Sequence, residues 1–252
     1  MLDSDKLNNV LNLLENSKHT TVFTGAGISV ESGIPPFRGE NGLWNKYDPD
    51  RFTLQEFMNN PRESWELNKK VFYDMFKNKN PNQAHEILAK WEDEGLVNAV
   101  ITQNIDGLHQ KAGSETIFKF HGTSQELICT ECSRIISFNE SQLNDLPPRC
   151  EECNGILKPN YVFFGEGIPR EEHENSLAEV EKADLFIIIG TTGEVMPACR
   201  IPLLASREGA NIIEVNTDKT NFTSRITDIF LQGKATDILK KLDSNIRSDK
   251  NG

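Results

Sequence analysis

The sequence predicts an α/β fold in which a parallel sheet carries helices on both faces and a small domain is attached. Short, continuously apolar segments recur along the chain, and helical patterns lie between or after them. Such alternation is typical of parallel strands that are buried on both faces. Two inserts, residues 37–78 and 126–155, interrupt it and are expected to pack together as the small domain. The large domain would comprise the remainder, residues 1–36, 79–125 and 156–252.

The expected elements follow from local patterns. Each expected strand is a short apolar run: TTVFT, NAVIT, LFIII, NIIEV and IFLQ, at residues 20–24, 98–102, 185–189, 211–215 and 229–232. A helix capped by Ser4 should precede the first strand, because apolar residues recur there at helical spacing: Leu7, Val10, Leu11 and Leu14. Other helix signals follow Thr53 and Pro61 or cover residues 171–182, 196–208 and 235–242.

The composition is that of an ordinary soluble globular protein, with 252 residues, 37% of them hydrophobic and 26% charged. The amino terminus has no basic segment followed by an apolar one, and the longest aliphatic run, LFIII, is far too short to cross a bilayer. We therefore expect a cytoplasmic protein without membrane contact. The net charge of −11 argues against nucleic-acid binding, which requires clustered Lys and Arg, and is compatible with lysine-rich peptides.

Four of the five cysteines form two close pairs, Cys129-x-x-Cys132 and Cys150-x-x-Cys153, with seventeen residues between them. Two such pairs are the typical ligand set of one tetrahedral zinc ion, in a zinc-ribbon module. Two disulfides are one alternative, which a cytosolic chain disfavours. A redox C-x-x-C is a weaker alternative, because two pairs are present and not one. Four sulfur ligands leave no open coordination position, so the zinc would be structural. The fifth cysteine, Cys199, lies in an apolar helical stretch and is expected to be a small buried hydrophobe.

Polar residues and glycines follow almost every expected strand. Because the carboxyl ends of parallel strands border the ligand crevice of a Rossmann-like sheet, these groups should converge on a bound nucleotide, although each alone could be an ordinary turn. Gly25 and Gly27 would offer exposed N–H groups to a pyrophosphate, and Ser29 with Thr191 or Thr192 would offer hydroxyls. The groups are Thr24-Gly25-Ala26-Gly27, Gln103-Asn104-Ile105-Asp106, Gly190-Thr191-Thr192, Asn216 and Gly233-Lys234-Ala235.

The first of these loops, TGAGISV, begins like the dinucleotide-binding turn of a dehydrogenase. Val30, however, stands where that turn has its third glycine. A hydride-transferring dehydrogenase is therefore disfavoured.

Seven motifs occur in the same order as in the sirtuins, the NAD-dependent protein-lysine deacylases. The chain resembles this family over residues 5–243, and among its members it resembles prokaryotic ones near the desuccinylase-type branch, class III. The motifs are GAGISVESGIPPFRG, TQNIDGLHQKAG, the HG before the first cysteine pair, the second cysteine pair, VFFGE, GTT and EVN.

The resemblance implies that NAD is a consumed co-substrate and assigns its site to the strand-end loops. Phe37 and Arg38 would belong to a mobile cofactor-binding loop that covers the reacting ribose. Gln103, Asn104 and Asp106 would reach the nicotinamide ribose and carboxamide, in a pocket lined by Ile105. The other implied contacts are Gly25, Ala26, Gly27 and Ser29 in the NAD-binding loop, and Gly190, Thr191, Thr192, Asn216 and Ala235 around the ribose and adenine.

The resemblance also implies the catalytic and peptide-binding residues. His121, with Asn104 beside it, would be catalytic, acting as general base toward the ribose hydroxyls once the acyl-lysine oxygen has replaced nicotinamide. Histidine suits this role because its ordinary pKa of about 6.5 lies near neutrality. An acylated lysine peptide would add as a strand beside the segment 162–166. The implied substrate contacts are Val162, Phe163, Phe164, Gly165, Glu166 and Val195.

The other histidines have simpler interpretations. His109 follows a turn in a short helix and is expected to make structural hydrogen bonds. His85 lies at helical spacing from Leu88 and is expected to pack in the core. His19 and His173 have polar neighbours and are expected at the surface.

Three departures from the family bear on the substrate. Desuccinylase-type sirtuins carry a Tyr-x-x-Arg pair whose Arg binds the acyl carboxylate, but Asn68 and Val71 stand at the matching positions here. We therefore predict a preference for acetyl or longer apolar acyl groups. Thr192 stands where serine is usual and keeps the hydroxyl. Glu194, near the expected peptide edge, would favour basic peptides.

Three classes of function fit these observations. Lysine deacylation is the leading hypothesis. Mono-ADP-ribosyl transfer to protein would use the same NAD cleavage with another acceptor. A non-catalytic zinc-containing interaction module would release no nicotinamide at all.

Overall fold

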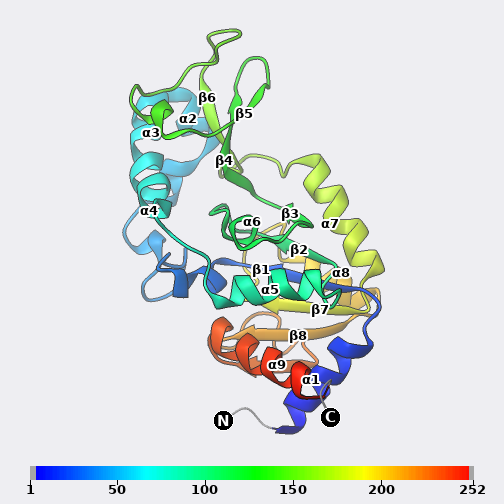
Figure 1. The fold of residues 1–252 in the computed structure, drawn as a ribbon. Helices are drawn as coiled ribbons and strands as arrows, with labels where there is room; N and C mark the ends of the chain where they lie inside the picture. The colour runs from blue at the N-terminus through cyan, green and yellow to red at the C-terminus, as the bar shows by residue number, and fades with distance from the viewer. Residues whose placement is uncertain (1–3, 250–252) are drawn as a thin grey trace.

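The fold is seen in a computed structural model that describes residues 4–249 (Figure 1). Its main sheet is parallel throughout and has the strand order β3-β2-β1-β7-β8-β9. The predicted Rossmann-like fold is confirmed, with the short edge strand β3 as an addition. The strands are β1 (Thr20–Thr24), β2 (Ala99–Thr102), β3 (Ile117–Lys119), β7 (Leu185–Ile189), β8 (Asn211–Asn216) and β9 (Ile229–Gln232).

Helices cover both faces of this sheet, because successive side chains of a strand point to opposite faces. Val22 packs in the apolar cluster that includes α1, α5 and α9, whereas its neighbour Phe23 packs in the cluster that includes α7 and α8. Figure 1 shows these two helical layers around the sheet. The helices are α1 (Ser4–Asn16), α5 (Gln83–Asp93), α7 (Arg170–Lys182), α8 (Arg200–Arg207) and α9 (Ala235–Asp249).

Two of these helices differ from their predicted lengths. α8 begins at Arg200 and not at residue 196, because residues 196–199 form a turn in which the Arg200 N–H donates to the Pro197 C=O at 2.9 Å. α9 continues past Leu242, because its apolar spacing continues as far as Ile246, which is buried against the sheet. The predicted cap at Ser4 concerns a side chain outside the described part of the structure.

The two inserts pack around one apolar core, at the top of Figure 1. Trp65 of the first insert is fully buried there, and its indole N–H donates to the Leu157 C=O at 2.8 Å. The three-stranded antiparallel sheet runs beyond the expected bounds 126–155, since it begins at residue 122 and ends at 161. The strands of this sheet are β4 (Gly122–Cys129), β5 (Ile135–Ser137) and β6 (Leu157–Tyr161). The helices of the first insert are α2 (Leu54–Asn59), α3 (Pro61–Asn68) and α4 (Asp74–Phe76).

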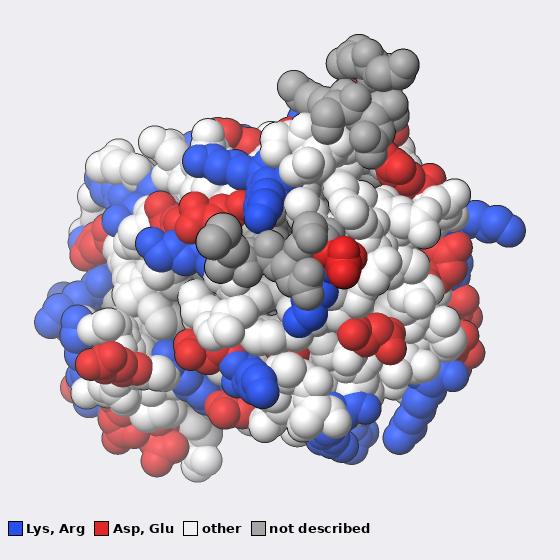
Figure 2. Space-filling model, turned by 90° about the horizontal axis from the view of Figure 1, so that it is seen from below, with Lys and Arg blue, Asp and Glu red and all other residues white. Residues whose placement is uncertain are grey.

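The lower face of the molecule, around α1 and α9, carries both signs of charge. Figure 2 shows its Lys and Arg side chains interspersed with Asp and Glu, so neither sign dominates that face. Among residues 4–249, no helix is both long and apolar enough to span a membrane.

Candidate active site

A cavity of about 820 Å³ lies at the carboxyl ends of the parallel strands and is lined by both domains. Its size is within the range of small-molecule and cofactor sites. Every residue predicted to bind NAD or peptide lines this cavity except Ser29 and Asp106. The converging loops are those that follow β1, β2, β7 and β8, together with the start of α9.

Glycine is needed at positions 25 and 27 because the loop after β1 touches the loop after β7 there. The Gly25 N–H donates to the Ile189 C=O at 3.0 Å, and the Gly27 N–H donates to the Gly190 C=O at 2.8 Å. A Cβ on Gly27 would lie 2.5 Å from the Gly190 Cα, so only glycine lets the loops after β1 and β7 touch. The prediction that these two N–H groups are free for a pyrophosphate is therefore wrong.

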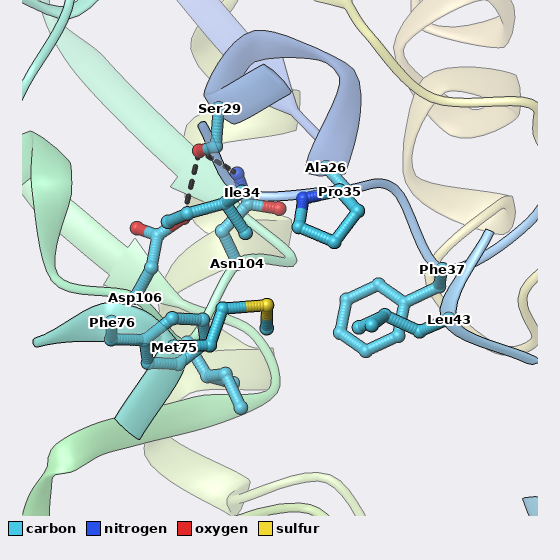
Figure 3. A pocket seen from close by; sticks show the side chains of 11 residues that line it. Ala26, Ser29, Ile34, Pro35, Phe37, Leu43, Met75, Phe76, Asn104 and Asp106 are labelled. Atoms are coloured by element: carbon cyan, nitrogen blue, oxygen red, sulfur yellow. Dashed lines mark hydrogen bonds between the residues drawn. The ribbon is translucent and has the colours of Figure 1, made fainter. Parts of the chain in front are cut away.

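Ser29 lies at a second cavity, of about 10 Å³, beside the large one (Figure 3). Its hydroxyl donates to Asp106 Oδ2 at 2.7 Å and accepts from Asn104 Nδ2 at 3.3 Å. Burial raises the pKa of Asp106, although hydrogen bonds from the Leu108 N–H and Ser29 oppose the shift. The Ser29 side chain is fully buried and already paired, which corrects the expectation that it offers a hydroxyl to a pyrophosphate.

Asn104 and Ile105 connect the two cavities, because both residues line each of them. Asn104 is held rigidly: its Nδ2 also donates to the Gly25 C=O at 3.1 Å, and its N–H donates to Thr102 Oγ1 at 3.0 Å. The two cavities therefore adjoin at Asn104, and Asp106 lines the smaller one.

Thr191 joins the loops on the other side of the cavity. Its Oγ1 accepts from Gln103 Nε2 at 3.0 Å, and its C=O accepts from Asn216 Nδ2 at 3.1 Å. Three predicted cofactor residues from three different strand ends are thus linked directly, in agreement with a single converging site.

His121 lines the large cavity with its ring held by the main chain. Nδ1 lies 3.2 Å from the Gln103 C=O. Because a carbonyl can only accept, Nδ1 carries the proton and Nε2 is left as the acceptor. Burial lowers the pKa of His121, and the bond to Gln103 opposes the shift. The imidazole is therefore neutral at pH 7 and able to take a proton.

The four predicted metal ligands lie together at one end of the small domain. The Sγ atoms of Cys129 and Cys153 are 3.4 Å apart, those of Cys132 and Cys150 are 3.8 Å apart, and all four lie within 4.8 Å of one another. A tetrahedron with Zn–S bonds of about 2.3 Å has S–S edges of about 3.8 Å. Disulfide bonds would require about 2.05 Å. The four thiols therefore fit a zinc ion and are not cross-linked.

A protein-family model described as the Sir2 family matches residues 25–197. The chain belongs to this family. It is 41% identical to an NAD-dependent protein deacylase of Pyrococcus abyssi over 244 residues, which cover 94% of this chain and 97% of that protein. A solved Sir2 homologue in complex with ADP-ribose has a TM-score of 0.91 and 36% identity, covering 96% and 97% of the two chains. A Sir2 structure with a p53 peptide and NAD+ has a TM-score of 0.86 and 34% identity, covering 95% and 98%.

The segment 162–166 of this sirtuin is already paired on one side. The Phe164 N–H donates to the Phe52 C=O, and the Phe164 C=O accepts from the Leu54 N–H, both at 3.0 Å. The Phe164 ring is 41% exposed and lines the cavity. A peptide strand would therefore meet this segment from the cavity side.

The expected cofactor-binding loop contacts the far side of the cavity in this sirtuin. Arg38 Nε lies 3.5 Å from Glu194 Oε2, and both side chains are largely exposed. Phe37 packs against Trp44. Because Arg38 already compensates Glu194, the effect of that carboxylate on basic peptides should be smaller than the sequence alone suggests.

Two histidines behind the cavity have the structural roles that were predicted. His109 is buried, with Nε2 3.0 Å from Thr24 Oγ1. His85 is fully buried beside it, and burial lowers its pKa to about 4. Cys199 differs from the prediction, because it is half-buried and precedes α8.

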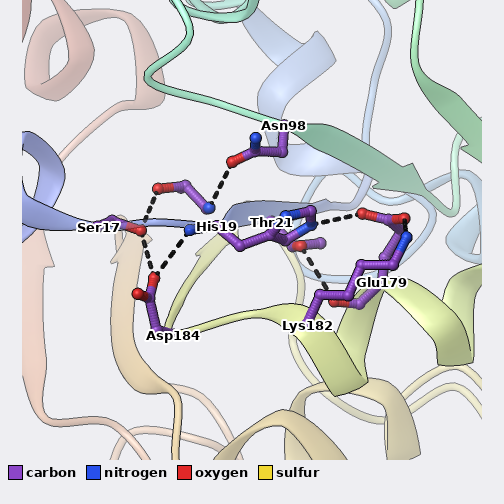
Figure 4. Close-up of polar contacts among 8 residues, drawn as sticks. Ser17, His19, Thr21, Asn98, Glu179, Lys182 and Asp184 are labelled. Atoms are coloured by element: carbon purple, nitrogen blue, oxygen red, sulfur yellow. Dashed lines mark hydrogen bonds and ion pairs between the residues drawn. The ribbon is translucent and has the colours of Figure 1, made fainter.

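His19 directly precedes β1, at the amino end of the sheet, whereas the cavity lies at the carboxyl ends of the strands. Figure 4 shows the polar contacts around His19. The prediction of a simple surface residue is wrong, because His19 is half-buried and its Nε2 lies 2.6 Å from Glu179 Oε2. Beside it, the Asp184 carboxylate accepts from the Lys18 N–H at 2.9 Å, from the His19 N–H at 3.1 Å and from the Ser17 hydroxyl. These contacts attach the start of β1 to α7 and β7.

The two positions that distinguish desuccinylases are buried in this sirtuin. Asn68 is fully buried, and its Oδ1 accepts from the Tyr161 hydroxyl at 2.6 Å. Val71 packs in the core of the small domain. Neither residue offers a cation to an acyl carboxylate.

Sequence reasoning missed several residues that line the large cavity. Trp44, Phe52 and Phe72 come from the aromatic-rich first insert, of which only Phe37 and Arg38 were predicted to reach the cofactor. Residues 217–220 continue the loop after β8. Their position directly after Asn216, at a strand end, is a signal that could have identified them.

Proposed function

We propose that this sirtuin is an NAD-dependent protein-lysine deacylase in which His121 is the general base. The observation that carries the proposal is the neutral imidazole of His121, with Nε2 left as the acceptor, in the cavity where the predicted NAD and peptide loops converge. NAD, when bound, would supply the ribose carbon that loses nicotinamide and receives the acyl oxygen; with one water consumed to release the amine, lysine, nicotinamide and O-acyl-ADP-ribose would be the products. His121 takes a proton from a ribose hydroxyl at Nε2.

The remaining residues of the site bind and orient. Asn104 stands where the two cavities meet, next to the buried Asp106, and this position suits a group that receives the nicotinamide end of the dinucleotide. Thr191, Asn216 and Ala235 border the other half of the cavity, where the adenosine would lie. The four cysteines hold a structural zinc ion, which takes no part in acyl transfer because no coordination position stays open.

The acyl group is expected to be acetyl or a longer apolar chain. Asn68 and Val71 are buried and uncharged, so a succinyl carboxylate entering the cavity near them would be desolvated without a cationic partner. We expect turnover of an acetyl-lysine peptide to exceed that of the matched succinyl-lysine peptide by at least about tenfold. Comparable rates on the two peptides would contradict this expectation.

Incubation with NAD and a panel of acyl-lysine peptides tests the proposal, with mass spectrometry of the products. A deacylase forms O-acyl-ADP-ribose and free lysine peptide in equal amounts. Label from NAD appearing on protein instead would favour mono-ADP-ribosyl transfer. If no peptide leads to release of nicotinamide, the result would favour the third hypothesis, a non-catalytic zinc-containing interaction module.

A further inference from the structure

Lys158 on β6 is a buried lysine that contacts none of the predicted catalytic groups. Its side chain is only 5% exposed. The three donors of its ammonium group are all used: toward the Pro159 C=O and the Tyr161 C=O, each at 2.8 Å, and toward Glu166 Oε2 at 3.1 Å. Lysine is almost never buried unless paired. Packing alone therefore does not explain why a charged lysine is buried at position 158.

Glu166, the partner of Lys158, closes a turn at the cavity. The Glu166 N–H donates to the Phe163 C=O at 3.0 Å, and the carboxylate oxygen that meets Lys158 also accepts from the Phe163 N–H at 2.9 Å. Gly165, within the turn, has a φ of +82°, in the left-handed region. The Lys158 ammonium group also lies 4.4 Å from the centre of the Phe163 ring.

The chain is connected to the catalytic histidine at the residue just before this turn. The Val162 N–H donates to the His121 C=O at 2.9 Å. Movement of the turn would therefore shift the peptide-facing Phe164 relative to His121. Replacing a buried ion pair by apolar groups is often neutral for stability, so a gain in stability does not by itself account for the pair. Fixing one conformation of the turn does account for it.

We infer that Lys158 is a positioning residue for the acyl-lysine peptide: acting through Glu166, it holds the turn of residues 163–166 in the conformation that receives the substrate strand. This inference rests on the proposed deacylase function. It also assigns Glu166 to shaping the peptide site from within the protein, in place of the direct substrate contact that the sequence suggested.

Steady-state kinetics of Lys158→Met and Lys158→Arg, with peptide and NAD varied separately, test this inference. We expect Lys158→Met to raise the KM for peptide by about tenfold or more and to leave the KM for NAD within about twofold. Lys158→Arg keeps the charge and should recover most of the peptide affinity. A general loss of structure would raise both KM values together. An unchanged peptide KM in Lys158→Met would overturn the inference, as would an equal rise in both values.

Glu166→Gln carries the same test if Lys158→Met does not fold, because the amide oxygen can still accept from Phe163 while the charge facing Lys158 is lost. It too should raise the KM for peptide and leave that for NAD unchanged; an unchanged peptide KM would overturn the inference. Lys77→Met is the matched control, since Lys77 and Glu140 form an exposed ion pair in the small domain, 2.9 Å apart. That variant should behave as wild type. Wild-type protein that does not deacylate the peptide would instead overturn the proposed function.

Discussion

At the amino end of the six-stranded sheet, the polar groups of Asp184 and His19 are paired within the protein, whereas at the carboxyl end the polar residues line a cavity of about 820 Å³, although several of them also pair with one another. Asp184 at the amino end accepts hydrogen bonds from three neighbouring groups, and His19 pairs with Glu179 (Figure 4). At the carboxyl end, the Nε2 of His121 is left as an acceptor by the bond that Nδ1 makes. The amino end of the sheet therefore carries contacts that stabilise the fold, and the carboxyl end carries the residues of the candidate active site.

This difference follows from how parallel strands are joined. The loops after the carboxyl ends diverge to the two faces of the sheet and leave a crevice between them, which a ligand can fill. At the amino end, the polar groups of Asp184 and His19 are instead satisfied by other groups of the protein. Substitutions at the carboxyl end should therefore change mainly activity, and substitutions at the amino end should change mainly stability.

The largest effect is expected from His121→Ala at the carboxyl end. Removing the general base should lower the rate of deacylation by about 10²- to 10⁴-fold. The melting temperature and the zinc content should match wild type, because within residues 4–249 the His121 side chain has a single hydrogen bond, to the Gln103 C=O. Full activity of His121→Ala would show the proposed mechanism to be wrong. The kcat/KM of wild type should fall on the acid side only below pH 6.5, since burial lowers the pKa of this base.

Gly27→Ala should affect both stability and NAD binding. The contact between the loops after β1 and β7 shapes the cavity and also holds the ends of these two strands together. The added Cβ would lie 2.5 Å from backbone of Gly190, so the loops must separate. We expect a loss of about 1–3 kcal/mol in the free energy of unfolding and a higher KM for NAD. Gly167→Ala is the control, because its Cβ would meet nothing within 4 Å. Equal behaviour of the two variants would argue against the loop contact.

Asp184→Asn at the amino end should change stability without changing activity. Burial opposes ionisation of Asp184, but hydrogen bonds from Ser17, Lys18 and His19 outweigh it and lower the pKa of the carboxyl. The ionised form therefore stabilises the fold above the ordinary pKa of about 3.9, and this contribution is lost as the pH falls through the lower folded-state pKa. We expect a loss of about 1–2 kcal/mol at pH 7 by chemical denaturation. Changed kinetic constants at 25 °C would contradict the separation of the two ends.

Glu194→Lys at the rim of the cavity should have the smallest effect. Glu194 is exposed and already paired with Arg38, so charge reversal acts through solvent-screened contacts. The KM of a lysine-rich acetyl peptide should rise about two- to threefold, and that of a neutral peptide should stay the same. If the rise is electrostatic, the difference in KM for the lysine-rich peptide between Glu194→Lys and wild type should shrink as the salt concentration is raised.

Much of the fold and of the candidate site was accessible from the sequence. Apolar runs such as LFIII indicated buried parallel strands, and the residues after those runs indicated where a ligand would lie, because strand ends converge on one edge. The cysteine spacing indicated a metal site directly. Helix ends were less accurate, as α8 shows, because residues 196–199 form a turn closed by the Arg200 N–H and are not part of the helix.

By itself, the sequence predicted which strand-end loops border the cavity and that four cysteines are placed to hold a metal, while its resemblance to the sirtuins implied a catalytic role for His121. Only the tertiary structure decided how individual groups are used. It showed that the N–H groups of Gly25 and Gly27 bind another loop, that Ser29 is paired with Asp106, and that Lys158 is buried against Glu166. The physical reason is that periodicity and spacing encode burial and direction along the chain, whereas the partner of a polar group is set by segments that meet only in the folded molecule.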